Sequence, residues 1–267
     1  MRPVSLELDS AELAATYDAT SLHQFTHGQA LVAELSLRPG QRVLDVGCGT
    51  GRLGAYVASL VAPDGEVVGI DPLPLRVELA AQKHPLFRAR VASAEDLSAF
   101  ADDSFDAAYA NSVFHWVERK PVALREAFRV LARGGRIALN SADADRPHQS
   151  SRLFREVLLQ AGVAGASSVN THGPPFRVNA STLGELLQQA GFVDVRVWNH
   201  VAVDIMSDTD EYVEWMRSST FGNFLLDVSS PDRERARALL EQKLEALRTP
   251  AGIPLERYLA FAAAQKP

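Results

Sequence analysis

The stretch RVLDVGCGTGRLG, residues 42–54, decides the fold of this chain. A short apolar run ends near Asp45, and glycines then occupy every second position, at Gly47, Gly49 and Gly51, before a helical pattern begins. Glycine has no Cβ, so such a loop can turn sharply through positive φ and let its backbone contact a flat ligand. The stretch therefore predicts a strand, a glycine loop that cradles a nucleotide, and a helix.

The glycine spacing alone leaves the ligand open, because residues 49–54 also fit the GxGxxG spacing of dinucleotide sites. A dinucleotide brings its pyrophosphate to the helix N-terminus, where Asp45 would place a carboxylate close to the phosphates. S-adenosylmethionine carries no phosphate, and its amino and sulfonium groups are cationic. Asp71 ends the predicted strand 66–71 and suits either ligand, since an acid there can accept hydrogen bonds from ribose hydroxyls. Asp45 therefore favours S-adenosylmethionine, with a nicotinamide cofactor as the alternative.

Composition limits the class of protein. At 267 residues and 46% apolar content, the chain can form one large domain or a domain with a cap. It has no apolar run of about 18 residues and no charged-then-apolar start, so we expect a cytoplasmic protein without a membrane segment. A net charge of −6 argues against a nucleic-acid partner, which a basic face would normally bind.

Cysteine and histidine usage does not predict a metal site. The single cysteine, Cys48, excludes an intramolecular disulfide and a cysteine-rich zinc site, and we interpret it as a small residue that fills the glycine loop. His23 and His27 lie four residues apart on a predicted helix, but no third ligand is evident near them. We interpret both as surface histidines.

Apolar periodicity alternates between strand and helix from residue 30 to 140, which is typical of a parallel sheet with crossover helices on both faces. The candidate strands of this part are 42–46, 66–70, 88–92, 105–110 and 135–140. Further elements are predicted beyond it: a helix near 150–162, a helix and strand within 182–199, two helices within 207–249, and a last strand at 257–264.

Within residues 15–142 the chain resembles the class I S-adenosylmethionine-dependent methyltransferases, particularly the small-molecule branch with the trans-aconitate, malonyl-carrier-protein and quinone-ring enzymes. The segments that carry the resemblance are VLDVGCGTG (43–51), GIDP (69–72), ASAEDL (92–97), DDSFDAAYANSVFHWV (102–117) and LREAFRVLARGGRIAL (124–139). The resemblance implies an α/β fold with a doubly wound Rossmann-like seven-stranded sheet, its last strand antiparallel. Arsenite methyltransferases resemble the same part but work through several cysteines, which this chain lacks.

The domain organisation predicted on this basis has a core interrupted by two insertions. Its parts are an N-terminal helical cap (1–40), the cofactor-binding core (41–142), a lid insertion (143–180), a return to the core (181–203), a helical lid insertion (204–250) and a C-terminal core strand (251–267). Both insertions follow strands, and ligands in open α/β sheets bind outside the carboxyl ends of the strands. We therefore expect the insertions to contact the acceptor.

The predicted cofactor site is spread over several segments. The glycine loop would face the methionine portion, the Asp71 segment would hold the ribose and pack on the adenine, and Ser93 replaces the aspartate often found at the adenine edge in the family. The resemblance adds the loop after the strand 105–110 and two N-terminal residues that fold over the cofactor. The full set is Tyr17, Gln24, Asp45, Gly47, Cys48, Gly49, Gly51, Asp71, Pro72, Leu73, Ser93, Ala94, Glu95, Asn111 and Ser112.

The expected activity is transfer of a methyl group from S-adenosylmethionine to a small organic acceptor, most readily at oxygen. The cofactor supplies the activated carbon, so a general base is needed only where the nucleophile must lose a proton. His115 is the candidate base, with a supporting role as its alternative, and Trp116, His148 and His172 are candidate substrate contacts. Transfer to carbon or nitrogen, a non-catalytic cofactor-binding protein and a nicotinamide oxidoreductase remain as alternatives.

Overall fold

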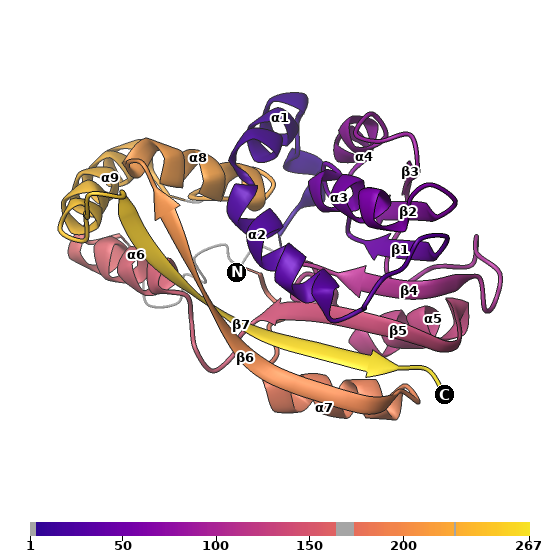
Figure 1. The fold of residues 1–267 in the computed structure, drawn as a ribbon. Helices are drawn as coiled ribbons and strands as arrows, with labels where there is room; N and C mark the ends of the chain where they lie inside the picture. Colours follow the sequence, from indigo (N-terminus) through magenta and orange to yellow (C-terminus); the bar gives the residue numbers. More distant parts are fainter. Residues whose placement is uncertain (1–3, 164–173, 227) are drawn as a thin grey trace. The chain divides into compact units, whose positions relative to one another are not determined.

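The computed structural model describes residues 4–163, 174–226 and 228–267 (Figure 1). The chain divides into two compact units. One, here called the core unit, comprises Leu22–Ala144, Phe176–His200 and Leu259–Pro267. The other, here called the accessory unit, comprises Met1–Ser21, Asp145–Pro175 and Val201–Tyr258.

A seven-stranded sheet in the order β3-β2-β1-β4-β5-β7-β6 organises the fold (Figure 1). The strands are β1 (Arg42–Val46), β2 (Glu66–Asp71), β3 (Phe87–Val91), β4 (Phe105–Ala110), β5 (Leu131–Ala142), β6 (Val193–Met206) and β7 (Ile253–Gln265). Strands β1 to β5 pair in parallel, and β7 runs antiparallel to β5. This confirms the predicted Rossmann-like sheet with an antiparallel last strand.

Three strands are longer than the sequence pattern predicts. Strand β5 begins at Leu131 because Gly134 and Gly135 form an irregularity inside the strand, where the register with β4 shifts, and do not precede it. Gly134 has a φ of +77°, which glycine adopts without a steric penalty. Strand β6 continues to Met206, and β7 begins at Ile253, so both strands contribute residues to both units.

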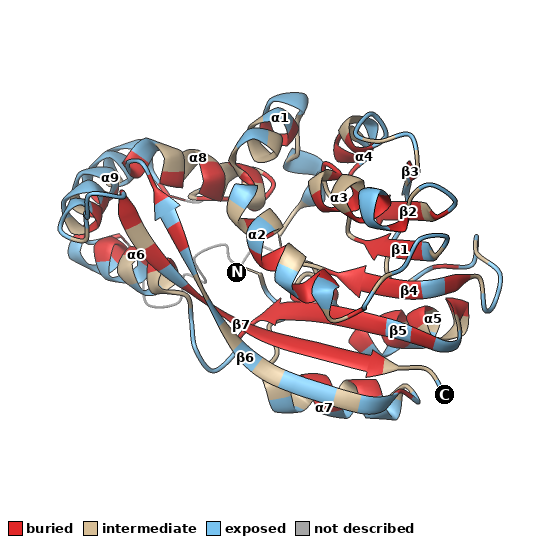
Figure 2. Cartoon of the chain, in the orientation of Figure 1, coloured by how far each residue is buried: buried red, intermediate tan, exposed pale blue. Residues whose placement is uncertain are grey.

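Helices cover both faces of the sheet in the core unit. These helices are α2 (Leu22–Ala33), α3 (Arg52–Val61), α4 (Pro74–Ala80), α5 (Lys120–Val130) and α7 (Ala180–Gln189). Neighbouring residues of β1 point to opposite faces: Val43 packs in the cluster with α2 and α3, whereas Leu44 packs in the cluster with α5 and α7. Strands β1, β4 and β5 are therefore mostly buried, while the edge strand β6 is largely exposed or half-buried (Figure 2).

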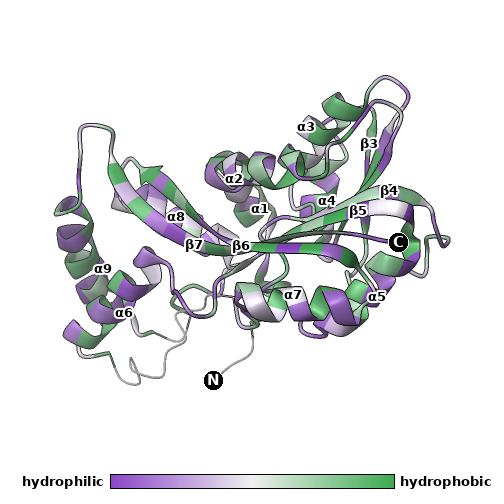
Figure 3. Ribbon diagram, turned by 60° about the horizontal axis from the view of Figure 1, so that its bottom comes forward, coloured by the Kyte–Doolittle hydropathy of each residue, from purple (hydrophilic) through white to green (hydrophobic). Residues whose placement is uncertain are grey.

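The accessory unit has its own hydrophobic cluster. Its elements are the short helix η1 (Leu6–Leu8), α1 (Ala11–Thr20), α6 (Gln149–Gln160), α8 (Thr209–Ser219) and α9 (Ser230–Glu245), with the adjoining ends of β6 and β7. Phe154, Trp215 and Leu240 bring α6, α8 and α9 into this cluster. Helix α9 carries hydrophilic as well as hydrophobic residues along its length (Figure 3). Among the described residues, no helix combines the length and the apolar character that crossing a membrane requires.

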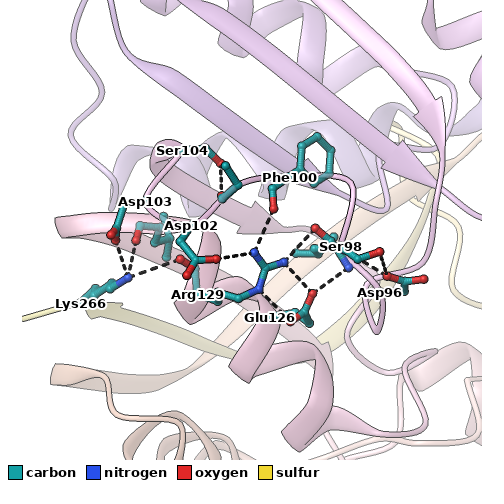
Figure 4. A network of polar contacts seen from close by, with 12 residues as sticks. Asp96, Ser98, Phe100, Asp102, Asp103, Ser104, Glu126, Arg129 and Lys266 are labelled. Carbon is teal, nitrogen blue, oxygen red and sulfur yellow. Dashed lines mark hydrogen bonds and ion pairs between the residues drawn. The ribbon is translucent and has the colours of Figure 1, made fainter.

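Arg129 on α5 binds the loop after β3 through hydrogen bonds and ion pairs (Figure 4). The guanidinium donates to the carbonyl oxygens of Phe100 and Leu97, each at 2.9 Å, and pairs with the carboxylates of Asp102 and Glu126. Glu126 in turn accepts a hydrogen bond from the backbone N–H of Leu97 at 3.0 Å. These contacts fix the loop that begins at the predicted adenine-binding segment.

Candidate active site

The glycine loop after β1 is tied to the end of β2. The backbone N–H groups of Gly47 and Cys48 both donate to the carbonyl oxygen of Ile70, at 2.7 and 2.9 Å. Oδ2 of Asp71 accepts from the N–H of Gly49 at 2.9 Å, and its Oδ1 accepts from the N–H of Leu73 at 3.0 Å. Asp71 therefore shapes the loop, in addition to its predicted role at the ribose.

Close packing explains the first and third glycines of the loop. Gly47 has a φ of +76°, and a Cβ there would lie 2.2 Å from a methyl group of Val113. Gly51 has a φ of +84°, and a Cβ there would lie 2.8 Å from the backbone of Ala80. Both positions therefore exclude a side chain on conformational and steric grounds.

Asp45 is a buried carboxyl group at this edge of the sheet whose pKa is strongly raised. It is 3% exposed, and no described residue donates a hydrogen bond to its Oδ2. Burial raises the pKa of Asp45 to about 7, against the opposing effect of the Tyr109 hydroxyl and with a further contribution from the negative charge of Asp71. A buried carboxyl group in this condition is suited to a cationic ligand, which would restore its ionised form.

The thiol of Cys48 is buried and is affected by the charges of both acids. Burial raises the pKa of its thiol well above the ordinary value, and the charges of Asp45 and Asp71 raise it further. A thiol in such an electronegative environment stays protonated and is a poor nucleophile. The structure thus supports the interpretation of Cys48 as a structural residue of the loop.

The predicted adenine segment forms a polar turn after β3. The hydroxyl of Ser93 accepts a hydrogen bond from the N–H of Glu95 at 3.2 Å, and Ala94 lies between them, half-buried. Glu95 binds the backbone N–H and the guanidinium of Arg119. Burial raises the pKa of Glu95, but the hydrogen bonds and the charge of Arg119 outweigh this effect and hold it below its usual value.

The side-chain amides of Asn111 and Asn140 form a chain of hydrogen bonds that connects α2, the loop that follows β4, and β5. Nδ2 of Asn111 donates to the carbonyl oxygen of Gln24 on α2 at 2.9 Å, and its Oδ1 accepts from Nδ2 of Asn140 at 2.8 Å. Oδ1 of Asn140 accepts from the backbone N–H of Ser112 at 2.7 Å. The hydroxyl of Ser112 shares a hydrogen bond of 2.9 Å with Nε2 of His27.

Two residues of α2 therefore belong to this edge of the sheet. Gln24 was predicted and is buried, and its Oε1 has no hydrogen-bond partner among the described residues. The interpretation of His27 as a surface histidine is wrong, because it is 3% exposed and bonded to Ser112. Gln24, His27 and Gly28 share a face of α2, and a Cβ at Gly28 would lie 2.7 Å from Nδ2 of Asn111.

His115 is held by the end of β5. Its Nδ1 accepts a hydrogen bond from the backbone N–H of Ala142 at 2.9 Å, and its carbonyl oxygen accepts from the N–H of Phe176 at 3.1 Å. An N–H donor at Nδ1 identifies the neutral ring as the tautomer with its proton on Nε2. Trp116 packs against the His115 ring at a centroid distance of 5.6 Å.

The remaining predicted residues do not all lie at these strand ends. Pro72 is exposed and Leu73 is the buried N-cap residue of α4, next to Asp71. Tyr17 on α1 and His148 belong to the accessory unit, where Nδ1 of His148 accepts from the N–H of Tyr258 at 3.0 Å. His172 lies outside the described residues.

Asn140, which is fully buried, was not among the residues predicted from the sequence. The available signal is a polar residue near the carboxyl end of an otherwise apolar run, RIALNSA, where the end of a central strand would normally be apolar. Residues at the carboxyl ends of β1, β2, β4 and β5 thus lie on both sides of the point where the strand order reverses, between β1 and β4. Ligands in open α/β sheets bind at this point.

The donor set at this edge fits a cationic nucleoside and does not form a metal site. The residues present are two buried carboxyl groups, a glycine loop with close backbone approach, and the buried amide oxygen of Gln24. Within the described part of the chain, no group of three or more His, Cys, Asp or Glu side chains is placed to hold a metal ion.

Comparison with known proteins agrees with this geometry. The family model described as "Methyltransferase domain" matches residues 44–139. The chain is 27% identical to a trans-aconitate 2-methyltransferase of Deinococcus radiodurans over 86% of this chain and 91% of that protein. It is 30% identical to the trans-aconitate 2-methyltransferase of Methylobacterium radiotolerans, covering 73% of this chain and 74% of the relative.

A solved structure supports the fold. The Haemonchus contortus phosphoethanolamine N-methyltransferase 2, in complex with S-adenosyl-L-methionine, superposes with a TM-score of 0.54 at 19% identity. The superposition covers 91% of this chain and 52% of the other.

Proposed function

This chain belongs to the class I S-adenosylmethionine-dependent methyltransferases, and on that premise we propose that it transfers the methyl group to a carboxylate oxygen of a small organic acid. The cofactor, when bound, supplies an activated methyl carbon for in-line displacement. The protein then has to bind, orient and shield the reactants, and to remove a proton only if the acceptor carries one.

The observation that carries the proposal is the hydrogen bond from the Ala142 N–H to Nδ1 of His115. With Nδ1 occupied and the proton on Nε2, the ring has no free nitrogen lone pair to accept a proton from a hydroxyl or an ammonium group. The His115 ring is therefore suited to supporting the loop or donating a hydrogen bond, and unsuited to the role of a base.

A carboxylate acceptor needs no base. Carboxyl groups titrate near pH 4, so a small organic acid is already ionised at neutral pH and its oxygen can attack directly. The acceleration then comes from alignment, which can contribute roughly 7–11 kcal/mol. Two relatives that cover 86% and 73% of this chain are named trans-aconitate 2-methyltransferases, a name that fits a carboxylate acceptor.

The same proposal assigns roles to the residues at the carboxyl edge of the sheet. The glycine loop would face the methionine portion of the cofactor, with Asp45 neutralising its cationic part. Asp71 would hold the ribose, and Ser93 to Glu95 would lie at the adenine. The segments 143–180 and 204–250 remain our proposal for the acceptor-binding part.

The decisive experiment identifies the bond that is formed. Purified protein is incubated with methyl-labelled S-adenosylmethionine and one acceptor in each reaction. The acceptors are trans-aconitate, other di- and tricarboxylic acids, a phenol and an amine. Carboxyl methyl esters release volatile methanol in mild alkali, whereas aryl methyl ethers, N-methyl and C-methyl products do not. Alkali-labile label with an acid acceptor supports the proposal, and alkali-stable label on the phenol or the amine, with none on the acids, would overturn it.

A further inference from the structure

Ser112 has an unusual backbone conformation in a part of the chain that adjoins the glycine loop. Its φ is +59°, in the left-handed region that L residues other than asparagine and aspartate rarely adopt. Such a conformation persists only where surrounding contacts fix it, and it is common at binding sites. Two contacts fix Ser112: Asn140 binds its N–H and His27 binds its hydroxyl.

The orientation of the amide chain is set by its two ends. The Ser112 backbone N–H can only donate, so it requires Oδ1 of Asn140, and the Gln24 carbonyl can only accept, so it requires Nδ2 of Asn111. The amide of Asn140 then donates to Oδ1 of Asn111, and every link is satisfied in one direction. Buried chains of this kind are mutually strengthening, and they are costly to interrupt.

The residue after Ser112 transmits this geometry to the glycine loop. Val113 lies so close to Gly47 that a Cβ at Gly47 would be 2.2 Å from its Cγ2. If Ser112 relaxed to negative φ, the chain direction at Val113 would change and this contact would be lost. Two residues further along β5, the N–H of Ala142 holds His115. Residues at the end of β5 therefore hold both Ser112 and His115 in the loop that follows β4.

We propose that Asn140 is a positioning residue, which together with His27 holds Ser112 in its left-handed conformation and thereby seats Val113 against Gly47 in the cofactor-binding loop. This inference concerns cofactor binding and does not depend on which acceptor the enzyme methylates. S-adenosylhomocysteine is therefore a sufficient probe, and its binding is measurable whether or not the carboxylate proposal holds.

The test is a double-mutant cycle between Asn140→Leu and Ser112→Gly, with the Kd of S-adenosylhomocysteine measured by calorimetry. Leucine has a similar volume but cannot hold the Ser112 N–H, whereas glycine adopts positive φ without assistance. We expect Asn140→Leu to raise Kd about fivefold to thirtyfold more in the wild-type background than in the Ser112→Gly background, which corresponds to the roughly 1–2 kcal/mol cost of a left-handed L residue.

Ser141→Ala is the matched control, because Ser141 is also fully buried on β5 but is the next residue of the strand and so belongs to its opposite face. Its hydroxyl bonds to the carbonyl oxygen of Ala142 and accepts from the N–H of Val178, not from the Ser112 loop. The effect of Ser141→Ala on Kd should be the same in both backgrounds. A purely structural role for Asn140 would lower the melting temperature of both Asn140→Leu proteins and raise Kd by equal factors, and that result would overturn the proposal.

Should Asn140→Leu fail to fold, the same cycle with His27→Phe tests the second contact. The phenyl ring keeps the volume of the imidazole but cannot bind the Ser112 hydroxyl. A loss of affinity that is present with Ser112 and absent in the Ser112→Gly background supports the inference, and equal losses in both contradict it.

Discussion

Oδ2 of Asp71 accepts a hydrogen bond from the backbone N–H of Gly49 at 2.9 Å, so the acid that ends β2 also sets the conformation of the glycine loop after β1. Its other oxygen is bound by the N–H of Leu73. Asp71 thus links the two strand ends at which the cofactor is expected to bind, and its substitution should affect loop and ligand together.

The first prediction is that Asp71→Asn weakens binding of S-adenosylhomocysteine by about 1–3 kcal/mol, because an amide NH2 would face a backbone N–H and the charge that assists both hydrogen bonds would be lost. Calorimetric titration measures the change. Asp64→Asn, which removes an exposed carboxylate from a turn, is the control and should leave the affinity unaltered. Wild-type affinity in Asp71→Asn would show that this residue does not contribute to cofactor binding.

The second prediction concerns the pH dependence of cofactor binding. With the pKa of Asp45 at about 7 before ligand binds, its ionised fraction rises from about a tenth at pH 6 to about nine-tenths at pH 8. Affinity for S-adenosylmethionine should rise by up to about tenfold over this range, and binding at pH 6.5 should release a proton, seen as a heat that depends on the buffer. A flat affinity profile with no proton release would contradict it.

The third prediction is that Asp45→Asn stabilises the unliganded protein at neutral and alkaline pH. The folded-state pKa of Asp45 lies above the unfolded value of 3.8, so the folded state binds the proton more tightly. The stabilisation of the folded state that comes from protonated Asp45 is therefore complete below pH 3.8 and is lost as pH rises through about 7. The melting temperature of Asp45→Asn relative to wild type should increase between pH 5 and pH 8, and a constant difference would refute this.

The fourth prediction separates support from base catalysis at His115. In His115→Asn the amide oxygen can take the place of Nδ1 and accept from the Ala142 N–H, but nothing at this position titrates near neutral pH. If the acceptor is a carboxylate, kcat should fall less than about tenfold, whereas loss of a general base costs about 10²- to 10⁴-fold.

A comparison with His115→Ala tests the supporting role itself. Alanine leaves the buried N–H of Ala142 unsatisfied, which should cost about 1–3 kcal/mol in the free energy of unfolding. Denaturant titration should therefore show His115→Ala to be less stable than His115→Asn. Equal stabilities, or a kcat loss in His115→Asn in the range of base removal, would disprove the role assigned here.

The fifth prediction addresses the accessory unit, where Arg257 is ion-paired with Asp204 and lies 4.4 Å from the ring centroid of Trp215. Both charged groups are under 10% exposed, and burial raises the pKa of Asp204 against the opposing effect of Arg257. Asp204→Leu should cost about 3–5 kcal/mol, because it leaves a buried guanidinium without its carboxylate.

The exposed pair between Arg237 and Asp210 supplies the control for this prediction. Asp210→Ala should cost under about 1 kcal/mol, as exposed ion pairs do. The double variant Asp204→Leu with Arg257→Met should be more stable than Asp204→Leu alone. A double variant that is less stable would show that the unpaired guanidinium does not cause the destabilisation by Asp204→Leu.

Local pattern was sufficient for much of the fold. The strand β1, its glycine loop and the acids Asp45 and Asp71 follow from residue types at short spacing, because a buried parallel strand, a positive-φ turn and a carboxylate at a strand end each have a local signature. Strand ends were less well predicted: Gly134 and Gly135 indicate a break by their type, but only pairing with β4 makes them an irregularity within β5.

The sequence by itself determined the fold class and the cofactor family, since both depend on short motifs in a fixed order. The tertiary structure alone decided that His27 is buried, that Asn140 binds Ser112 and that Nδ1 of His115 is occupied by a backbone N–H. These contacts join residues 27 to 85 positions apart, and a side chain's hydrogen-bond partner across such a distance has no local signature. The pattern therefore identifies which residues can do chemistry, and the packing of β5 and α2 against the loop after β4 determines which chemistry each can do.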